Sequence, residues 1–349
     1  MLKKYLSEKK EIVEGNLQKK LQKYEYPDEL AEGMEYAVMN GGKRIRPILM
    51  YMICDLFGKE YEAVEDVAVA LEFIHCYSLV HDDLPAMDDD MYRRGKLTTH
   101  VKYGEAPAIL VGDVLLTEAF NVISNSDKIS DKSKAEIILK LSEYAGFYGM
   151  VGGQFVDIKS ENQIIEKSEK GVAEARKILS YIHQHKTGKL LTAAIELPLI
   201  TLRIEGEKKK KLIEYSELIG IAFQIKDDIL DIEGDFLETG KESNDEENHK
   251  MTYPSLYGLE KSKEMLSEYL KKANEIIEKY DIDTEKSYAY GDTTGDLSML
   301  RRFGNAYTIN PSKKLLERIK KDEELSKKVN VIVERKDVIY KLKANVTTL

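Results

Sequence analysis

Apolar residues recur at intervals of three or four over most of this chain, from the N-terminus to about residue 280. In LIGIAFQIKDDILDI, for example, this spacing is kept by Leu218, Ala222, Ile225, Ile229 and Ile232. An α-helix brings residues three and four apart onto one face, whereas a half-buried strand requires alternation. Stretches of clean alternation are few in this part of the chain. The pattern predicts an all-α architecture with long buried helices.

The character of the chain changes after about residue 280. KSYAYGDTTGDLSMLRRFGNAYTINPSKKLLERIKK is typical of strand, loop, helix, strand and helix, and VNVIVE at 329–334 is typical of a further short strand. We therefore expect a helical domain over 1–280 and a small α/β-like appendage over 281–349.

Charge and cysteine content narrow the class of protein. Lys and Arg number 53 and Asp and Glu 62, a formal net charge of −9, which disfavours nucleic acid as a partner. Local basic residues can still bind anionic small molecules. The two cysteines, Cys54 and Cys76, fit neither a disulfide framework nor a CxxC metal site. This favours a reducing, cytoplasmic setting.

A membrane location is not expected. The apolar stretches near RPILMYMICDLF, VAVALEFIHCYSLV and LLTAAIELPLITL stop short of the ~18 to 20 residues that a span requires. The N-terminal segment MLKKYLSEKKEIVEGNLQKK is a charged amphipathic helix without the apolar region of a secretory signal. We expect a soluble protein that binds no membrane.

Two aspartate-rich clusters each follow an apolar helical run. HDDLPAMDDDMYRRG places five aspartates between Asp82 and Asp90, and FQIKDDILDIEGD contains Asp227, Asp228 and Asp231. Crowded like charges cost free energy unless cations bind them. One such cluster is more often a solvated helix end, but two clusters with basic residues nearby predict a cation site.

The spacing within each cluster allows two carboxylates to share a cation. Asp227 and Asp231 are four apart, so they lie on one helix face, with Gln224 one turn earlier. Asp82 and Asp88 are six apart, which does not fit a regular helix, but the proline of LPAM interrupts the helical ladder and a bulge would bring them together. Oxygen ligands in this number suit Mg²⁺, which binds one or two carboxylates together with substrate phosphates.

Basic residues that could bind a diphosphate accompany both clusters. They are Lys43, Arg44 and Arg46 of NGGKRIRP, Arg93, Arg94, Lys186 beside Thr187, Lys241 and Lys250. GGKR does not match the GxxxxGK[ST] phosphate loop, so the sequence does not suggest NTP hydrolysis.

Together these motifs resemble those of the trans-type polyprenyl diphosphate synthases, most closely the bacterial farnesyl diphosphate synthases (geranyltranstransferases). The resemblance covers most of the chain from about residue 25 to 280, through GGKRIRP, FIHCYSLVHDDLPAMDDDMYRRG, GDVLLTEAF, GGQFVDI, IHQHKTGKL, FQIKDDILDIEGD and KMTYPSLYGLEKSKE. It implies the isoprenoid synthase helical bundle around a central cavity, and a homodimer. It also implies Mg²⁺-dependent head-to-tail condensation of isopentenyl diphosphate with dimethylallyl or geranyl diphosphate.

The resemblance further implies a role for each matched position. The metal ligands would be Asp82, Asp88 and Asp227, and the catalytic set would be completed by Asp83, Asp228 and Asp231. The allylic diphosphate would be bound by Arg93, Lys186 and Lys241, and isopentenyl diphosphate by Lys43, Arg46, His75 and Arg94. The space where carbocation character develops would be lined by Thr187 and Gln224.

The length of the product should depend on what blocks the bottom of the cavity. Tyr77, with Ser78 beside it, precedes Asp82 by slightly more than one helical turn, and DDLPAMD carries a two-residue insertion. This combination resembles the farnesyl-producing pattern and favours a C15 product. The alternatives are a geranylgeranyl or longer-chain diphosphate synthase, with Tyr77 as an ordinary core aromatic, and an inactive or regulatory relative.

Two features depart from the family pattern. The loop usually written GKxxGxD is here GKESNDEENHK, with Asn244 in place of a glycine. The C-terminal segment resembles the end of haloacid-dehalogenase-type phosphatases, with Asp292 and Asp296 at their last metal-binding motif. No DxDxT nucleophile motif precedes it, so we expect a non-catalytic appendage, with phosphatase activity as the alternative. A terpene cyclase is disfavoured because an NDxxSxxxE-like motif is missing.

Overall fold

The structure, a computed structural model, describes residues 2–160, 168–233, 251–279, 288–291, 297–309, 311, 313–335 and 338–343. The chain divides into two compact units, Lys3–Ile276 and Ile277–Leu349. The predictions for Lys241, Asn244 and Lys250 of the 234–250 loop, and for Asp292 and Asp296, lie outside the described residues.

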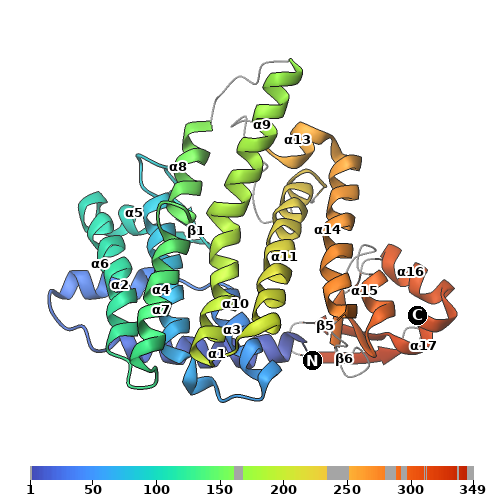
Figure 1. Cartoon of the computed structure of the whole chain (residues 1–349), viewed down its shortest axis with the longest axis horizontal. Helices are drawn as coiled ribbons and strands as arrows, with labels where there is room; N and C mark the ends of the chain where they lie inside the picture. Colours follow the sequence, from blue (N-terminus) through green and yellow to red (C-terminus); the bar gives the residue numbers. More distant parts are fainter. Residues whose placement is uncertain are drawn as a thin grey trace. The chain divides into compact units, whose positions relative to one another are not determined.

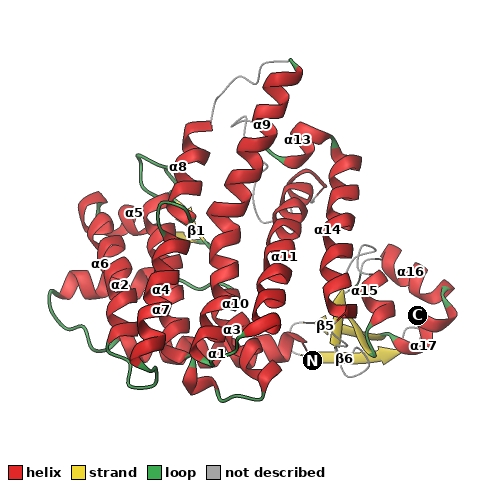
Figure 2. Ribbon diagram, in the orientation of Figure 1, coloured by secondary structure: helices red, strands yellow, loops and turns green. Residues whose placement is uncertain are grey.

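The first unit is built from helices (Figures 1 and 2). They are α1 (Leu2–Leu21), α2 (Asp28–Met39), α3 (Ile45–Phe57), η1 (Tyr61–Ala63), α4 (Glu65–Asp82), α5 (Thr99–Tyr103), α6 (Glu105–Ser124), α7 (Asp131–Ala145), α8 (Met150–Ser160), α9 (Glu169–Ile182), η2 (His183–Gly188), α10 (Lys189–Thr201), α11 (Gly206–Glu233), α13 (Tyr253–Tyr257) and α14 (Leu259–Lys279). A short antiparallel ribbon, β1 (Tyr92–Arg93) and β2 (Lys96–Leu97), follows α4. The all-α prediction for this part of the chain is confirmed.

Polar side chains cap several of these helices. The Ser130 hydroxyl accepts a hydrogen bond from the Ser133 amide at the start of α7, and Ser168 does the same for Gly171 at the start of α9. Thr252 and Ser255 form a reciprocal capping box at α13. Caps satisfy amide groups that have no partner inside the helix, and so define where each helix begins.

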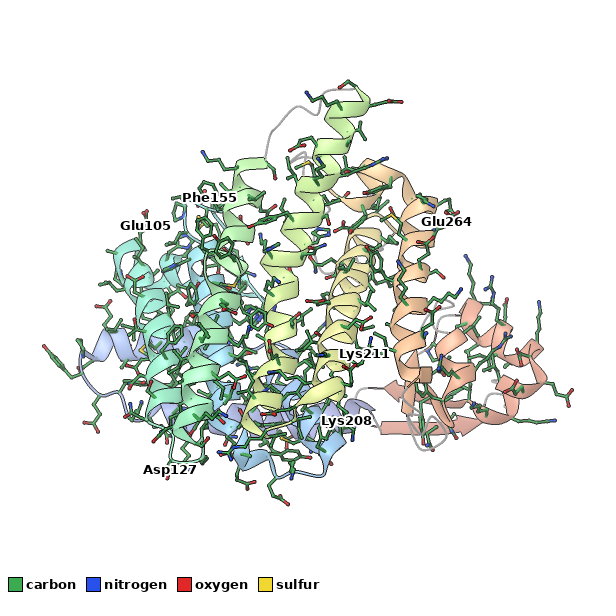
Figure 3. The ribbon with its side chains drawn as sticks, in the orientation of Figure 1. Glu105, Asp127, Phe155, Lys208, Lys211 and Glu264 are labelled. Carbon is green, nitrogen blue, oxygen red and sulfur yellow. The ribbon has the colours of Figure 1, made fainter. Side chains whose placement is uncertain are left out.

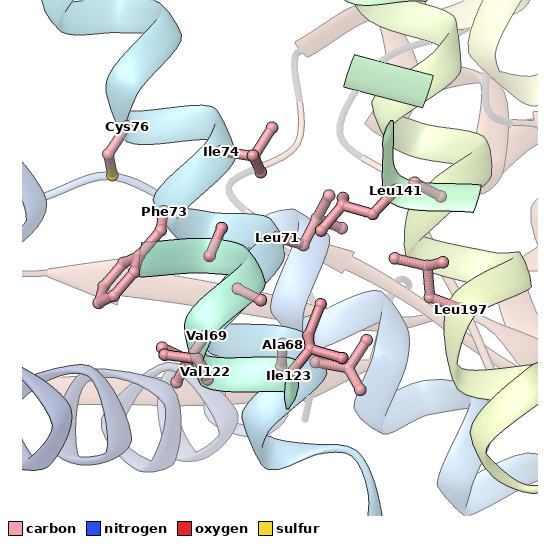
Figure 4. Close-up of a cluster of buried hydrophobic side chains, with 14 of the residues drawn as sticks. Ala68, Val69, Leu71, Phe73, Ile74, Cys76, Val122, Ile123, Leu141 and Leu197 are labelled. Carbon is pink, nitrogen blue, oxygen red and sulfur yellow. The ribbon is translucent and has the colours of Figure 1, made fainter. Parts of the chain in front are cut away.

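Helix α4 is the centre of the core. Twelve of its 18 residues are buried, so it is covered on nearly all sides. Figure 4 shows its side chains meeting α6, α7 and α10, through Leu71, Phe73, Val122, Ile123, Leu141 and Leu197. This burial fixes the helix whose C-terminal end carries the first aspartate cluster.

Helix α11 buries the middle of the predicted apolar stripe. Ile225 and Ile229 pack with Leu179 of α9 and Tyr253 of α13. The last residue of the stripe, Ile232, is 55% exposed, so the predicted burial is wrong at that end of the helix.

Helix α6 corrects the expectation that every apolar stretch is too short for a membrane span. It has 20 residues and a mean hydropathy of 1.6, which meets the length and composition of a span. In the folded chain 39% of this apolar window is buried. The sequence reading overlooked it because Asp113 and Glu118 interrupt the apolar run. A core helix has the same composition, and α6 packs against α4 through Val111 and Leu115.

The second unit contains a four-stranded sheet with strand order β3-β4-β5-β6. Its elements are β3 (Tyr288–Gly291), α15 (Leu297–Arg302), β4 (Asn305–Ile309), α16 (Lys313–Lys321), α17 (Glu323–Lys328), β5 (Asn330–Arg335) and β6 (Val338–Lys343). Neighbours pair in parallel except β5 and β6, which are antiparallel. Its core is Leu300, Ala306, Leu315, Ile319, Leu325, Val329 and Val331. The predicted strands and helices are present, and β6 and α17 were not predicted.

Candidate active site

The first aspartate cluster forms a bend at the C-terminal end of α4. The Asp88 amide donates to the Asp82 carbonyl across 2.9 Å, and the Met87 amide donates to the Leu84 carbonyl across 2.8 Å. These bonds close the LPAM segment into a bulge that returns Asp88 to the side of Asp82. The bulge predicted from the proline is confirmed.

The Asp82 carboxylate lies in an unfavourable electrostatic setting. Burial raises the pKa of Asp82 to about 6, Lys186 opposes that shift, and the carboxylates of Asp88 and Asp83 add to it. A cation held between Asp82 and Asp88 would relieve this cost. Among the residues that the structure describes, no group of three or more His, Cys, Asp or Glu is placed to hold a metal. Asp82 and Asp88 supply two carboxylates, and Mg²⁺ commonly binds one or two carboxylates and takes its other ligands from water and substrate phosphates.

Asp83 has a different partner from Asp82. The Arg93 Nε donates to both Asp83 oxygens, at 2.7 and 2.9 Å, and an Arg93 terminal nitrogen lies 2.5 Å from Asp83 Oδ1. Arg93 also lies 3.3 Å from Asp90. Asp83 is buried, so this fork ties the ribbon after the cluster to the end of α4.

Lys186 enters the site from the π-helical segment η2. Its Nζ lies 2.6 Å from Asp157 Oδ2 on α8. Burial lowers the pKa of Lys186, but Asp157, Asp82 and Asp88 outweigh burial, and the net shift is upward. Close contact of α8 with η2 requires Gly153, because a Cβ there would lie 2.2 Å from the Lys186 amide nitrogen. The pairing role of Asp157, within the GGQFVDI motif, was missed from sequence.

A second basic wall comes from the Gly-Gly turn before α3. Gly42 has a φ of +116°, and a Cβ there would lie 2.4 Å from an Arg94 guanidinium nitrogen. Arg94 donates to the carbonyl of Gly41. Arg44 instead turns inward, where it lies 2.8 Å from Glu72. Arg44 is therefore an anchor of this turn, while Lys43 is exposed.

A cavity of about 370 Å³ connects these groups. Its polar lining residues include Arg46, His75, Asp82, Gln154, Lys186 and Thr187, and its apolar or aromatic ones are Tyr77, Leu79, Met87, Met150, Val151, Phe155, Ile158 and Leu190. Ser78 and His81 also line it. Phe155 is 63% exposed on α8 (Figure 3), so it borders both the cavity and the surface.

Two polar side chains of this lining stand out, His75 for its protonation and Gln154 for its hydrogen bonding. Burial and the positive charges of Arg46 and Arg94 lower the pKa of His75 well below its ordinary value, so His75 is neutral at pH 7. Both amide atoms of Gln154 are buried without a hydrogen-bond partner in the described part of the chain. Gln154 was not assigned from sequence, although GGQFVDI contains it. An unpaired buried amide is costly unless a ligand satisfies it.

The second aspartate cluster lies on α11, and its described members, Asp227 and Asp228, are not among the residues that line the cavity. Asp228 Oδ2 accepts a hydrogen bond of 2.8 Å from the Tyr253 amide and lies 3.9 Å from His183 Nε2. Burial lowers the pKa of His183 to about 4. Asp228 thus anchors the start of α13. Asp227 and Gln224 are partly buried on α11, and the Asp231 side chain lies outside the described side chains.

Comparison with known proteins gives a consistent match over the helical unit. The polyprenyl synthetase family model matches residues 27–289. A farnesyl diphosphate synthase of Geobacillus stearothermophilus is 40% identical over 282 residues, covering 80% of this chain and 92% of the relative. A geranylgeranyl diphosphate synthase of Cyanophora paradoxa is 40% identical over 279 residues, 79% of this chain and 90% of the relative. The crystal structure of a geranyltransferase from Legionella pneumophila superposes with a TM-score of 0.68 at 32% identity, covering 80% of this chain and 91% of that one.

Proposed function

The chain belongs to the polyprenyl synthetase family, and from this premise we propose that it makes farnesyl diphosphate by Mg²⁺-dependent head-to-tail condensation of isopentenyl diphosphate with dimethylallyl or geranyl diphosphate. The observation that carries the proposal is the cavity itself, whose lining combines charged groups with apolar side chains. Asp82 and Lys186 line it, and so does the buried Tyr77, slightly more than one turn before Asp82 on α4. A diphosphate with a hydrocarbon tail has this same combination.

In this proposal Asp82 and Asp88 would hold Mg²⁺ together with the allylic diphosphate, and by family resemblance Asp227 of α11 would join them. Bound Mg²⁺ supplies charge neutralisation to the departing diphosphate. Lys186 donates hydrogen bonds to the same group, and Asp157 keeps that lysine charged. Arg93 and Lys241 complete the allylic site by family resemblance.

Carbon–carbon bond formation follows ionisation of the allylic C–O bond. The terminal carbon of the isopentenyl double bond attacks the allylic cation, and a proton lost to the departing diphosphate restores an alkene. Lys43, Arg46 and Arg94, with the neutral His75, hold the isopentenyl diphosphate. By family resemblance, Thr187, which lines the cavity, and Gln224 supply oxygen dipoles for the developing positive charge, and the apolar lining excludes water that would quench it.

Tyr77 is proposed to close the cavity at C15, with Ser78 beside it. The Tyr77 side chain is only 6% exposed and belongs to the cavity lining. The similarity to a geranylgeranyl diphosphate synthase keeps a C20 product as the second candidate. We further propose a cytoplasmic homodimer that needs neither nucleic acid nor membrane, and a non-catalytic role for residues 281–349.

The test is an assay of the full chain with radiolabelled isopentenyl diphosphate, Mg²⁺ and either dimethylallyl or geranyl diphosphate, followed by sizing of the dephosphorylated products. A C15 alcohol that requires Mg²⁺ is expected. A C20 or longer alcohol would keep the reaction and reject the chain length. No product from a folded protein would favour an inactive or regulatory relative, and hydrolysis of a generic phosphomonoester would favour the phosphatase alternative.

A further inference from the structure

His81 lines the cavity and has no role in the reaction described above. It lies on α4 one turn after Tyr77, and its side chain is 27% exposed. The two rings meet edge to face, with centroids 5.8 Å apart and planes inclined by 81°. This geometry is favourable for an aromatic pair, so the position of one ring limits the position of the other.

The far side of the His81 ring is held by α6. His81 Nε2 lies 3.0 Å from the Ile109 carbonyl oxygen. A carbonyl only accepts hydrogen bonds, so Nε2 carries the hydrogen and donates it. The Asp113 Oδ1 atom lies 3.9 Å from the same nitrogen. The ring is therefore fixed between Tyr77 on its own helix and the backbone of α6.

Gly112 makes room for this arrangement. A Cβ at Gly112 would lie 2.1 Å from His81 Nε2, 2.4 Å from Cδ2 and 2.8 Å from Cε1. These distances are too short for any side chain, so the ring lies directly on the backbone of α6. Because α6 blocks one side, we expect a displaced ring to move away from α6, toward Tyr77 and the cavity that both side chains line.

We propose that His81 is a positioning residue which holds the Tyr77 ring across the cavity, and that Gly112 admits it, so that the contact between α4 and α6 sets the product length rather than Tyr77 alone. This inference rests on the proposed prenyl transfer. It predicts opposite effects of two single substitutions. His81→Ala frees the Tyr77 ring and deepens the cavity, whereas Gly112→Ala pushes the His81 ring inward and makes the cavity shallower.

The experiment compares product distributions of purified variants supplied with dimethylallyl diphosphate, isopentenyl diphosphate and Mg²⁺. His81→Ala should raise the C20 to C15 ratio about two- to tenfold, the range that loss of one aromatic pair supports. Gly112→Ala should raise the C10 to C15 ratio. In the double variant the ring that Gly112→Ala displaces is gone, so its products should match those of His81→Ala. Gly15→Ala is the matched control, because in the described part of the chain a Cβ there meets no atom within 4 Å beyond its neighbours and its own helix backbone.

Two further variants separate the mechanism from a general loss of structure. His81→Gln keeps a donor for the Ile109 carbonyl but lacks the ring, so it should lengthen the product as His81→Ala does, even if Gly112→Ala does not fold. In a Tyr77→Ala background, His81→Ala should change the product ratio no further.

Three results would overturn the inference. The first is a C15 product alone from folded His81→Ala and His81→Gln proteins. The second is an equal increase in product length on His81→Ala whether Tyr77 is present or replaced by alanine. The third is a double variant whose product ratios show the summed effects of the two single substitutions. Product length rather than turnover is the measured quantity, because His81 is next to Asp82 in the chain and its replacement also affects turnover. If the unsubstituted chain makes no prenyl product, the proposed function fails and this inference fails with it. A C15 product that is insensitive to His81 refutes the inference alone.

Discussion

Replacing Asp82 with asparagine should make the metal-free protein more stable while it removes activity. Asparagine has nearly the same size but no charge, so it preserves packing at the end of α4. Burial and the nearby carboxylates raise the pKa of Asp82 from 3.8 to about 6. At about 1.4 kcal/mol per pKa unit, the charged form is disfavoured in the folded state by about 3 kcal/mol. We expect Asp82→Asn to recover about 1 to 3 kcal/mol of unfolding free energy at pH 7.5.

The contribution of Asp82 to the free energy of unfolding depends on pH. Between pH 4 and pH 6 the folded Asp82 keeps a proton that the unfolded chain releases. Its contribution to stability therefore falls as the pH rises through this window and stays unfavourable above it. Asp82→Asn lacks this slope, so the two proteins should be equally stable near pH 3.5 and differ most above pH 6.

The predicted stability difference is measured by thermal unfolding, once with a chelator and once with Mg²⁺ plus a diphosphate. The metal-free variant should melt several degrees higher than the wild type at pH 7.5, at about 2 °C per kcal/mol. Added Mg²⁺ and diphosphate should stabilise the wild type and have little effect on the variant, because one metal ligand is missing. Turnover should fall by orders of magnitude.

The matched control is Asp66→Asn on the same helix. Asp66 is 3% exposed and lies 2.7 Å from Lys20 Nζ. Burial opposes its charge, but Lys20 and Ser126 lower its pKa overall. Its replacement should therefore destabilise the protein, and Mg²⁺ should still bind. A metal-free Asp82→Asn protein that melts at or below the wild-type temperature at pH 7.5 would refute the electrostatic reasoning.

Three further substitutions test other parts of the site. Tyr77→Ala should lengthen the product by at least one isoprene unit, measured by chromatography. An unchanged C15 product would show that Tyr77 does not close the cavity. Gly42→Ala should displace Arg94 and raise the KM for isopentenyl diphosphate about tenfold, the effect of losing one charge-assisted hydrogen bond, with a smaller effect on the KM for geranyl diphosphate. Asp157→Asn should lower the pKa of Lys186, so the alkaline limb of the pH–rate profile should move to lower pH, and an unmoved limb would separate this pair from catalysis.

The helical fold was predictable because its signal is local. Within each segment, apolar residues recur every three or four positions, which predicts a helix. After residue 280 this spacing changes, which predicts the small sheet. The bulge that joins Asp82 to Asp88 was predictable for the same reason, since a proline interrupts the ladder between them. The membrane-span length of α6 was missed because Asp113 and Glu118 interrupt its apolar run.

Sequence pattern was sufficient for the helices, the acidic bend and the presence of basic residues beside it. It did not assign partners to the charged side chains. Asp157 meets Lys186 from another helix, and Arg44 turns away from its neighbour Lys43 to reach Glu72. The ring of His81 is seated on Gly112 by the close approach of α4 and α6. Such contacts depend on how residues far apart in the chain pack in the folded core, because charge and ring positions are determined by burial and distance rather than by order along the chain.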